Sequence, residues 1–223
     1  MRILIATKAP RPGRSKTRLL PTLSPVDAAR LHEALLLDTL DCATREATSV
    51  ALLVAEAADV PVLRELVGDV EIVLQHGAGL ADALFHAFAA AAAKAPVAVI
   101  SADTPGLPAG EIAAAAAALA GGADVALGPT PDGGYWLIAM AAQHAAPFRD
   151  IPWSTDECLA VTLDRCRDAS LDVHLGASWR DIDVPDDFAW LRIAVDTGLA
   201  PRTASLLPVL GDRTPPSPHR AGG

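Results

Sequence analysis

The chain has 223 residues, of which 51% are hydrophobic and 4% are aromatic, and its formal net charge is -9. This length suits one sizeable α/β domain, and the acidic balance argues against nucleic acid as a general partner. No run reaches the roughly 18 to 20 apolar residues of a membrane span, and charges follow the first strand too soon for a secretory signal, so we expect a cytoplasmic protein.

The first half of the chain is expected to alternate between apolar strands and helices. Residues 2–7 read as a buried strand, and a basic loop follows them. A helix is expected to begin next, because Ser24 is a favourable N-cap, Pro25 suits the first helical position and Asp27 stands where a capping-box acid belongs. The remaining segments of this half are a strand over 49–55, a short helix over 61–67 and a strand over 70–75.

The second half continues this alternation up to residue 129. The expected segments are a helix over 79–94, a strand over 97–101, a helix over 109–122, strands over 124–129 and 132–140, a helix over 155–167, a strand over 171–175 and a helix over 185–195. Strands that are continuously apolar and alternate with helices are typical of a parallel sheet covered on both faces. We therefore predict an α/β fold with a mostly parallel sheet, in one domain over residues 1–199. Residues 200–223 are rich in proline and glycine, and we expect a disordered tail.

The three cysteines do not indicate a disulfide framework or a thiolate zinc site. Cys42, Cys158 and Cys166 are odd in number and form no C-x-x-C pair. This pattern agrees with a cytoplasmic protein.

The loop after the first strand, KAPRPGRSKTRL, concentrates positive charge in an otherwise acidic chain. It leaves the carboxyl end of a strand, where open parallel sheets bind ligands. It does not match a P-loop, because Pro10 and Ser15 stand where glycines are needed. Its glycine allows close backbone approach, and its basic side chains suit phosphate oxygens, although a solvated loop is the alternative. The predicted nucleotide-binding residues here are Lys8, Arg11, Gly13, Arg14, Lys16 and Arg18.

Two acidic segments follow strands. Asp103 follows the strand VAVIS at its carboxyl edge, and Asp181 and Asp183 lie between a strand and a helix in WRDIDVPDDF. Mg²⁺ usually takes one or two carboxylates together with substrate phosphates, so a carboxylate at a strand end suits it. The alternative for Asp103 is a turn and the alternative for Asp183 is a helix cap.

Two glycine-containing turns are further candidates. Asp132, Gly133 and Gly134 form a turn signal at the mouth of a strand, where glycines also leave room for a substrate. Gln75 and Gly79 precede a helix, whose backbone amides can face an anion or a base edge. Both segments are also explained as simple turns.

Taken together, these segments resemble the nucleotide-diphospho-sugar transferase (GT-A) superfamily from about residue 2 to residue 195. The likeness rests on KAPRPGRSKTRL, SADTPGL, GPTPDGGYWLI, IPWST and DIDVPDDF in this order. The chain is most similar to the radical-SAM/selenodomain-associated transferases, which are often labelled glycosyltransferases. It is more distantly similar to 2-phospho-L-lactate guanylyltransferases and molybdenum-cofactor guanylyltransferases.

The resemblance implies a Rossmann-like GT-A fold and a site for a nucleotide donor and Mg²⁺ or Mn²⁺. It implies that the basic loop holds the donor phosphates, that Asp103 and Asp183 bind the metal, and that Gln75 and Gly79 lie near the base. Lys16, Asp103 and Asp183 are then the catalytic residues.

Three functions are compatible with these residues. The favoured one is nucleotidyl transfer from a nucleoside triphosphate to a phosphorylated small molecule, with release of pyrophosphate, because such an acceptor needs no general base. Glycosyl transfer from a nucleotide-sugar is the alternative, with Asp132 as the candidate base. The third is a nucleotide- or partner-binding domain without catalysis. Nucleic acid and membrane partners are not expected, and the nucleobase, the acceptor and the oligomeric state stay open.

Overall fold

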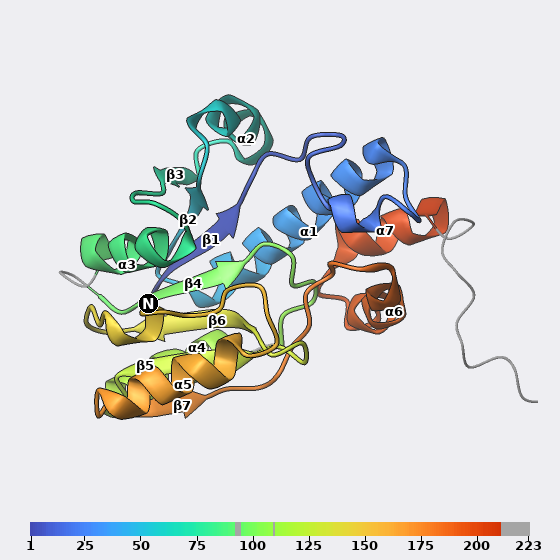
Figure 1. Ribbon diagram of the computed structural model, residues 1–223. Helices are drawn as coiled ribbons and strands as arrows, with labels where there is room; N and C mark the ends of the chain where they lie inside the picture. Colours follow the sequence, from blue (N-terminus) through green and yellow to red (C-terminus); the bar gives the residue numbers. More distant parts are fainter. Residues whose placement is uncertain (92–94, 109, 211–223) are drawn as a thin grey trace, which may run out of the picture. The chain divides into compact units, whose positions relative to one another are not determined.

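Seven strands form one sheet, as the continuously apolar segments predict. In the computed structural model, which describes residues 1–91, 95–108 and 110–210, the strands lie in the order β3-β2-β1-β4-β6-β5-β7 (Figure 1). Their bounds are β1 (Arg2–Thr7), β2 (Ser49–Val54), β3 (Glu71–Leu74), β4 (Val97–Ser101), β5 (Val125–Pro129), β6 (Tyr135–Met140) and β7 (Val173–Leu175). Neighbouring strands are parallel except where β6 runs antiparallel to β4 and to β5. The prediction of a mostly parallel sheet is therefore confirmed.

Helices occupy most of the connections between these strands. The α-helices are α1 (Pro25–Glu46), α2 (Val60–Val67), α3 (Leu80–Ala91), α4 (Glu111–Ala120), α5 (Cys158–Asp168), α6 (Phe188–Asp196) and α7 (Pro201–Leu210). Short 3-10 turns are η1 (Thr17–Leu19), η2 (Ala57–Asp59), η3 (Ala146–Phe148) and η4 (Pro185–Asp187). No helix in the described part of the chain is both long and apolar enough to cross a membrane.

Contacts within the chain define two compact units. The sheet unit comprises Met1–Lys8, Ala43–Ser101 and Pro108–Arg180, and it contains every strand. The helical unit comprises Ala9–Cys42, Ala102–Leu107 and Asp181–Gly223, and it contains α6, α7 and most of α1. The sequence predicts one domain over residues 1–199 and does not anticipate this grouping.

The sheet unit has a core on one face built from strands, α3 and α5. Leu4, Leu53, Val99 and Leu127 pack with side chains of these helices, including Phe88. The intervening strand residues, such as those flanking Leu4, are buried as well. Both faces of the central strands are therefore shielded from water, which explains their long apolar runs.

The helical unit has its own core around α1. Its buried cluster comprises Leu19, Leu23, Ala28, Leu31, Leu35, Ile182, Phe188, Leu191 and Leu210. Helix α1 begins as the sequence predicts: the Asp27 amide donates to Ser24 Oγ at 3.1 Å, and Ser24 Oγ donates to the Asp27 carboxylate at 2.7 Å. These bonds satisfy a backbone donor at the start of the helix.

The expectation of a disordered segment from residue 200 is wrong for α7. Leu210 is buried in the helical unit, and Leu206 and Leu207 pack against the same cluster. The buried carboxylate of Asp38 accepts the backbone amides of Arg202 and Thr203, at 3.1 and 2.8 Å. Asp38, which is distant in the sequence, thus caps the start of α7. The proline content of this segment had argued against a helix here. Residues 211–223, the rest of the predicted tail, lie outside the described residues.

Candidate active site around Lys16

The basic loop turns tightly around a buried serine. Ser15 Oγ donates to the Ala9 carbonyl and accepts the Arg11 amide, at 3.1 and 3.0 Å. The amides of Arg14 and Ser15 both donate to the Arg11 carbonyl. Gly13 stands in this turn with φ +75°, a conformation that glycine adopts without a steric penalty. This network sets the direction in which the next residue leaves the turn.

Lys16 points into the helical unit. Its backbone has φ 49° and ψ 43°, the left-handed conformation that non-glycine residues seldom adopt. Its side chain is only 3% exposed. The ammonium lies 2.7 Å from Asp103 Oδ2 and 2.8 Å from Asp183 Oδ1, and it donates to the Ile182 carbonyl at 2.5 Å. The cation predicted to meet donor phosphates is therefore held by two carboxylates and a carbonyl.

Asp103 lies on a short segment, residues 102–107, that is packed into the helical unit. The Asp103 carbonyl accepts the Ile182 amide at 3.1 Å. Gly106 has φ +61°, and a Cβ there would come within 2.7 Å of the Ala194 carbonyl oxygen of α6. The glycine of the SADTPGL segment is thus required by close packing and by its backbone conformation.

Asp183 uses its carboxylate to bind cations rather than to cap a helix. The Asp187 carboxylate accepts the amides of Asp183 and Val184, both at 2.9 Å, and so fulfils the capping role at η4. Asp183 instead contacts Lys16, and Arg18 approaches its second oxygen at 3.7 Å. Of the acids in WRDIDVPDDF, Asp183 is the one that shares Lys16 with Asp103.

The charges in this cluster stabilise one another. Burial by itself lowers the pKa of Lys16, but the carboxylates of Asp103 and Asp183 outweigh burial and raise that pKa above its ordinary value. Burial raises the pKa of Asp103, but the Lys16 ammonium and the hydrogen bond from His32 hold it well below its usual range. Lys16 is therefore a cation and Asp103 an anion throughout the physiological pH range.

Helix α1 supplies two residues that the sequence analysis did not identify. The His32 side chain is 3% exposed, and its Nδ1 lies 3.1 Å from Asp103 Oδ1. Because a carboxylate only accepts hydrogen bonds, His32 Nδ1 carries the hydrogen. Two turns further on, the Thr39 hydroxyl donates to the Ala102 carbonyl at 3.3 Å. The sequence feature that could have identified His32 is its position in the apolar stripe of α1, beside Ala28 and Leu35.

Other residues of the basic loop lie at the surface of the helical unit. Arg14 is exposed, and the Arg18 side chain is 65% exposed. Arg11 is partly buried, and Lys8 is exposed at the point where the sheet unit ends. The loop thus buries one cation, Lys16, and presents Arg14 and Arg18 to solvent.

The turn of Asp132, Gly133 and Gly134 connects β5 and β6 in the sheet unit. The Asp132 carboxylate accepts the Thr130 hydroxyl and, at 3.3 Å, the Gly134 amide. A Cβ on Gly133 would come within 2.0 Å of the Asp156 carbonyl oxygen. The turn therefore packs closely against the segment before α5. This packing is sufficient to explain the glycine at 133.

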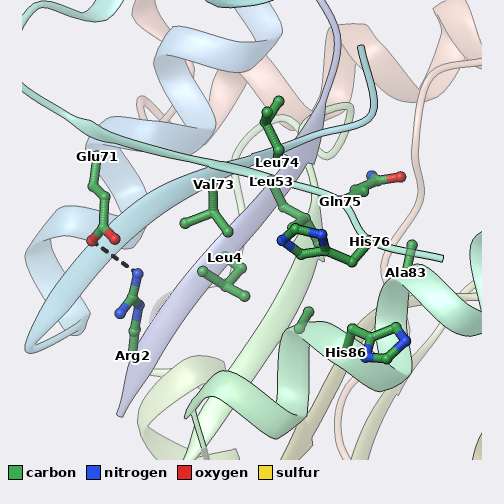
Figure 2. A pocket seen from close by; sticks show the side chains of 11 residues that line it. Arg2, Leu4, Leu53, Glu71, Val73, Leu74, Gln75, His76, Ala83 and His86 are labelled. Atoms are coloured by element: carbon green, nitrogen blue, oxygen red, sulfur yellow. Dashed lines mark ion pairs between the residues drawn. The ribbon is translucent and has the colours of Figure 1, made fainter. Parts of the chain in front are cut away.

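Gln75 and Gly79 also belong to the sheet unit. Gln75 follows β3 and lines a cavity of about 190 Å³, together with Leu4, Leu53, Val73 and His86 (Figure 2). Gly79 has φ +92° and stands just before α3. The Asp82 carboxylate accepts the Ala78 amide at 2.9 Å and stabilises this turn. Both residues thus lie where the sequence places them, at a strand-to-helix connection.

The oxygen atoms around Lys16 suit a hard divalent cation. Asp103, Asp183 and the Ile182 carbonyl direct three oxygen atoms to one point, which is the position of Lys16 Nζ. Within residues 1–91, 95–108 and 110–210, no three His, Cys, Asp or Glu side chains form a group that could hold a metal ion. Two carboxylates completed by substrate phosphates are nevertheless a usual ligand set for Mg²⁺, so the donors present fit such a cation.

The comparison with protein families gives one match. The family described as "Uncharacterized protein conserved in bacteria (DUF2064)" matches residues 37–155, which is more than half of the chain. No curated protein matches the chain.

Solved structures match over nearly the whole chain. A candidate nucleotide-diphospho-sugar transferase from Desulfovibrio desulfuricans G20 is 24% identical, with a TM-score of 0.84 over 95% of this chain and 97% of that one. The inositol-1-phosphate CTP transferase from T. maritima is 14% identical, with a TM-score of 0.55 over 91% and 95%. Glucosyl-3-phosphoglycerate synthase from Mycobacterium tuberculosis, solved with Mn²⁺ and uridine-diphosphate, is 11% identical, with a TM-score of 0.53 over 91% and 79%.

These identities are low enough that the likeness shows the fold alone. The fold is the Rossmann-like α/β fold of nucleotidyltransferases and GT-A glycosyltransferases, which confirms the predicted resemblance at that level.

Proposed function

The chain belongs to the bacterial protein family DUF2064, and from its site we infer an enzyme that transfers a nucleotidyl group from a nucleoside triphosphate to a phosphorylated small molecule. Pyrophosphate is the second product. The acid–base cluster of Lys16, Asp103 and Asp183 carries this proposal.

This cluster combines the two kinds of group that phosphoryl chemistry requires. Cationic groups neutralise the charge that a triphosphate carries and that moves onto the leaving pyrophosphate. Arg14 and Arg18 are exposed on the same loop as Lys16 and are suited to phosphate oxygens. The carboxylates of Asp103 and Asp183 lie directly beside Lys16 and are suited to the counter-cation of the nucleotide.

Asp103 and Asp183 are the residues that would hold Mg²⁺ or Mn²⁺. Such a cation, when bound, withdraws charge from phosphate oxygens and orients the reacting groups. The protein's own residues fix the carboxylates in advance: His32 donates to one oxygen of Asp103, and the Ile182 amide donates to the carbonyl of the same residue. Preorganised charge of this kind is worth more than charge that must reorient during the reaction.

The environment of Asp132 favours a phosphorylated acceptor over a hydroxyl acceptor. A hydroxyl group needs a base to remove its proton, whereas a phosphate is already an anion. Asp132 is the base that the sequence offers, and its carboxylate accepts two hydrogen bonds within its own turn. The carboxylate is thus engaged within its own turn.

Glycosyl transfer from a nucleotide-sugar is the second candidate. It is favoured by the match with the Desulfovibrio desulfuricans protein, which covers 97% of that candidate sugar transferase. In this case the basic loop would bind the diphosphate of the donor, and Asp132→Asn would slow turnover more than binding.

A paired assay separates the candidates. The protein is incubated with Mg²⁺, a panel of nucleoside triphosphates and phosphorylated acceptors, and pyrophosphate is measured; in parallel, nucleoside diphosphate is measured with a panel of nucleotide-sugars. Pyrophosphate release that requires both the triphosphate and the acceptor supports nucleotidyl transfer. Release of nucleoside diphosphate alone would replace it with glycosyl transfer. Nucleotide binding without formation of either product would indicate a domain that binds nucleotide but does not catalyse a reaction.

A further inference from the structure

The Lys16 ammonium uses all of its hydrogen-bonding capacity inside the protein. A lysine ammonium has three hydrogens, and three oxygen atoms lie within hydrogen-bond distance of Nζ, from Asp103, Asp183 and Ile182. The side chain is also almost completely shielded from solvent. In this arrangement no ammonium hydrogen remains for a phosphate.

The same arrangement conflicts with a divalent cation. Asp103 and Asp183 are the donors for that cation, and their nearest oxygens are directed at one ammonium. A second positive charge at this point would be placed against the first at close range, which is strongly unfavourable where water is excluded. Lys16 and a divalent cation therefore compete for the pair.

We propose that Lys16 is a resident counter-cation that a divalent cation replaces: it holds Asp103 and Asp183 together in the nucleotide-free protein and moves to the donor phosphates when the cation binds. This inference rests on the proposed function for the identity of the final partner of Lys16. The exchange itself concerns only the protein and the cation.

Other contacts hold Asp103 and Asp183 in position when the Lys16 ammonium leaves them. The two carboxylates are more accessible than the lysine, because the Asp103 and Asp183 side chains are 24% and 41% exposed while Lys16 is 3% exposed. His32 contacts the Asp103 oxygen that Lys16 does not use. The Asp187 carboxylate holds the backbone amide of Asp183. Removal of the ammonium thus leaves both acids anchored.

The exchange couples cation binding to nucleotide binding. A cation that binds alone must expel a buried ammonium without giving it new acceptors, which costs free energy. A triphosphate supplies those acceptors, so each ligand strengthens the binding of the other. In the absence of nucleotide, Lys16 therefore stays on the carboxylate pair until the concentration of the divalent cation is high.

The first test measures Mn²⁺ affinity without nucleotide, by the paramagnetic signal of the free ion, in the wild type, Lys16→Met and Arg18→Met. Arg18 is the matched control because it also brings a positive charge near Asp183, but from the exposed side. Lys16→Met should bind Mn²⁺ about tenfold or more tightly than the wild type, and Arg18→Met should differ from it by less than about threefold. Equal or weaker binding by a folded Lys16→Met protein would overturn the exchange, and so would an equal gain in both variants.

The second test uses the wild type and does not depend on the folding of a variant. An amine-modifying reagent is applied with and without Mn²⁺, and the labelling of Lys16 relative to Lys8 is measured by mass spectrometry. Mn²⁺ should raise that ratio by about threefold or more, because the expelled ammonium becomes accessible. An unchanged ratio at saturating Mn²⁺ contradicts the proposal. Both tests omit donor and acceptor, so they can succeed when the proposed reaction fails, and can fail when it succeeds.

Discussion

His32 and Asp103 are 71 residues apart in the chain, and Nδ1 of His32 lies 3.1 Å from Oδ1 of Asp103. The contact joins a buried position of α1 to the start of the segment that follows β4. Lys16 binds the other carboxylate oxygen, so both oxygens of Asp103 are held by buried side chains.

Replacing His32 should impair turnover more than folding. His32→Leu removes a hydrogen bond to a charged group and should lower kcat about 10- to 100-fold. His32→Asn keeps a donor close to the position of Nδ1 and should recover most of the loss. Steady-state kinetics at several Mn²⁺ concentrations, together with thermal unfolding, provide the measurement. If the two variants are equally impaired, His32 acts through packing alone.

Loss of the Lys16 charge should destabilise the protein. Lys16→Met leaves Asp103 and Asp183 without their shared cation, and removing one partner of a buried ion pair is destabilising. We expect the free energy of unfolding to fall by about 1–3 kcal/mol, less than for a fully buried pair because both carboxylates are partly exposed. Urea denaturation checks this value. An unchanged stability would show that the cluster contributes little to folding.

Much of the sheet was predictable from local sequence. The strands at residues 2–7 and 97–101 agree with β1 and β4 at both ends, because uninterrupted β-branched and aliphatic residues stop at polar or proline-containing loops. The start of α1 was predictable for the same reason, since Ser24 and Asp27 carry their own capping chemistry. These are features that a chain segment determines by itself.

The candidate site was predictable in composition but not in its contacts. The sequence identifies Lys16, Asp103 and Asp183 individually. It does not reveal that Lys16 turns inward, because that depends on a left-handed backbone conformation and on acceptors brought together by tertiary folding. Helix α7 was missed for a related reason: its cap, Asp38, lies far away on α1.

The packing of α7 should be measurable with two neighbouring residues. Leu210 is 1% exposed and Val209 is 59% exposed on the same helix. Leu210→Ala should lower the free energy of unfolding by about 2–5 kcal/mol, whereas Val209→Ala should change it by less than about 0.5 kcal/mol. Chemical denaturation of both variants gives the comparison. Equal effects would mean that α7 does not dock through Leu210.

Gly106 should tolerate a side chain less well than Gly198. Both residues have positive φ, +61° and +74°, but only at Gly106 would a Cβ meet backbone, the Ala194 carbonyl oxygen at 2.7 Å. Gly198→Ala should cost about 1–2 kcal/mol, which is the conformational penalty alone. Gly106→Ala should cost about 1–3 kcal/mol more because α6 must shift. The melting temperatures of the two variants test this difference, and its absence would remove close packing as the reason for glycine at 106.

Cys166 should make stability depend on alkaline pH. The residue is fully buried, and burial, aided by the negative charge of Asp124, raises the pKa of its thiol from 9.0 to about 11. The unfolded chain therefore loses this proton at lower pH than the native protein does. The stabilisation is complete below about pH 8 and is lost as pH rises from about 9 to about 11, by about 2 kcal/mol at pH 10.5.

The control for this pH dependence is Cys166→Ala, which has no thiol to ionise. The free energy of unfolding of the wild type minus that of the variant, from urea denaturation, should be constant up to about pH 8 and should then decrease by about 2 kcal/mol by pH 10.5. Groups that ionise in this range and do not interact with Cys166 affect both proteins equally and cancel in the difference. A difference that stays constant to pH 10.5 would show that the native thiol ionises as readily as the unfolded one, and therefore that water reaches Cys166 in the native protein.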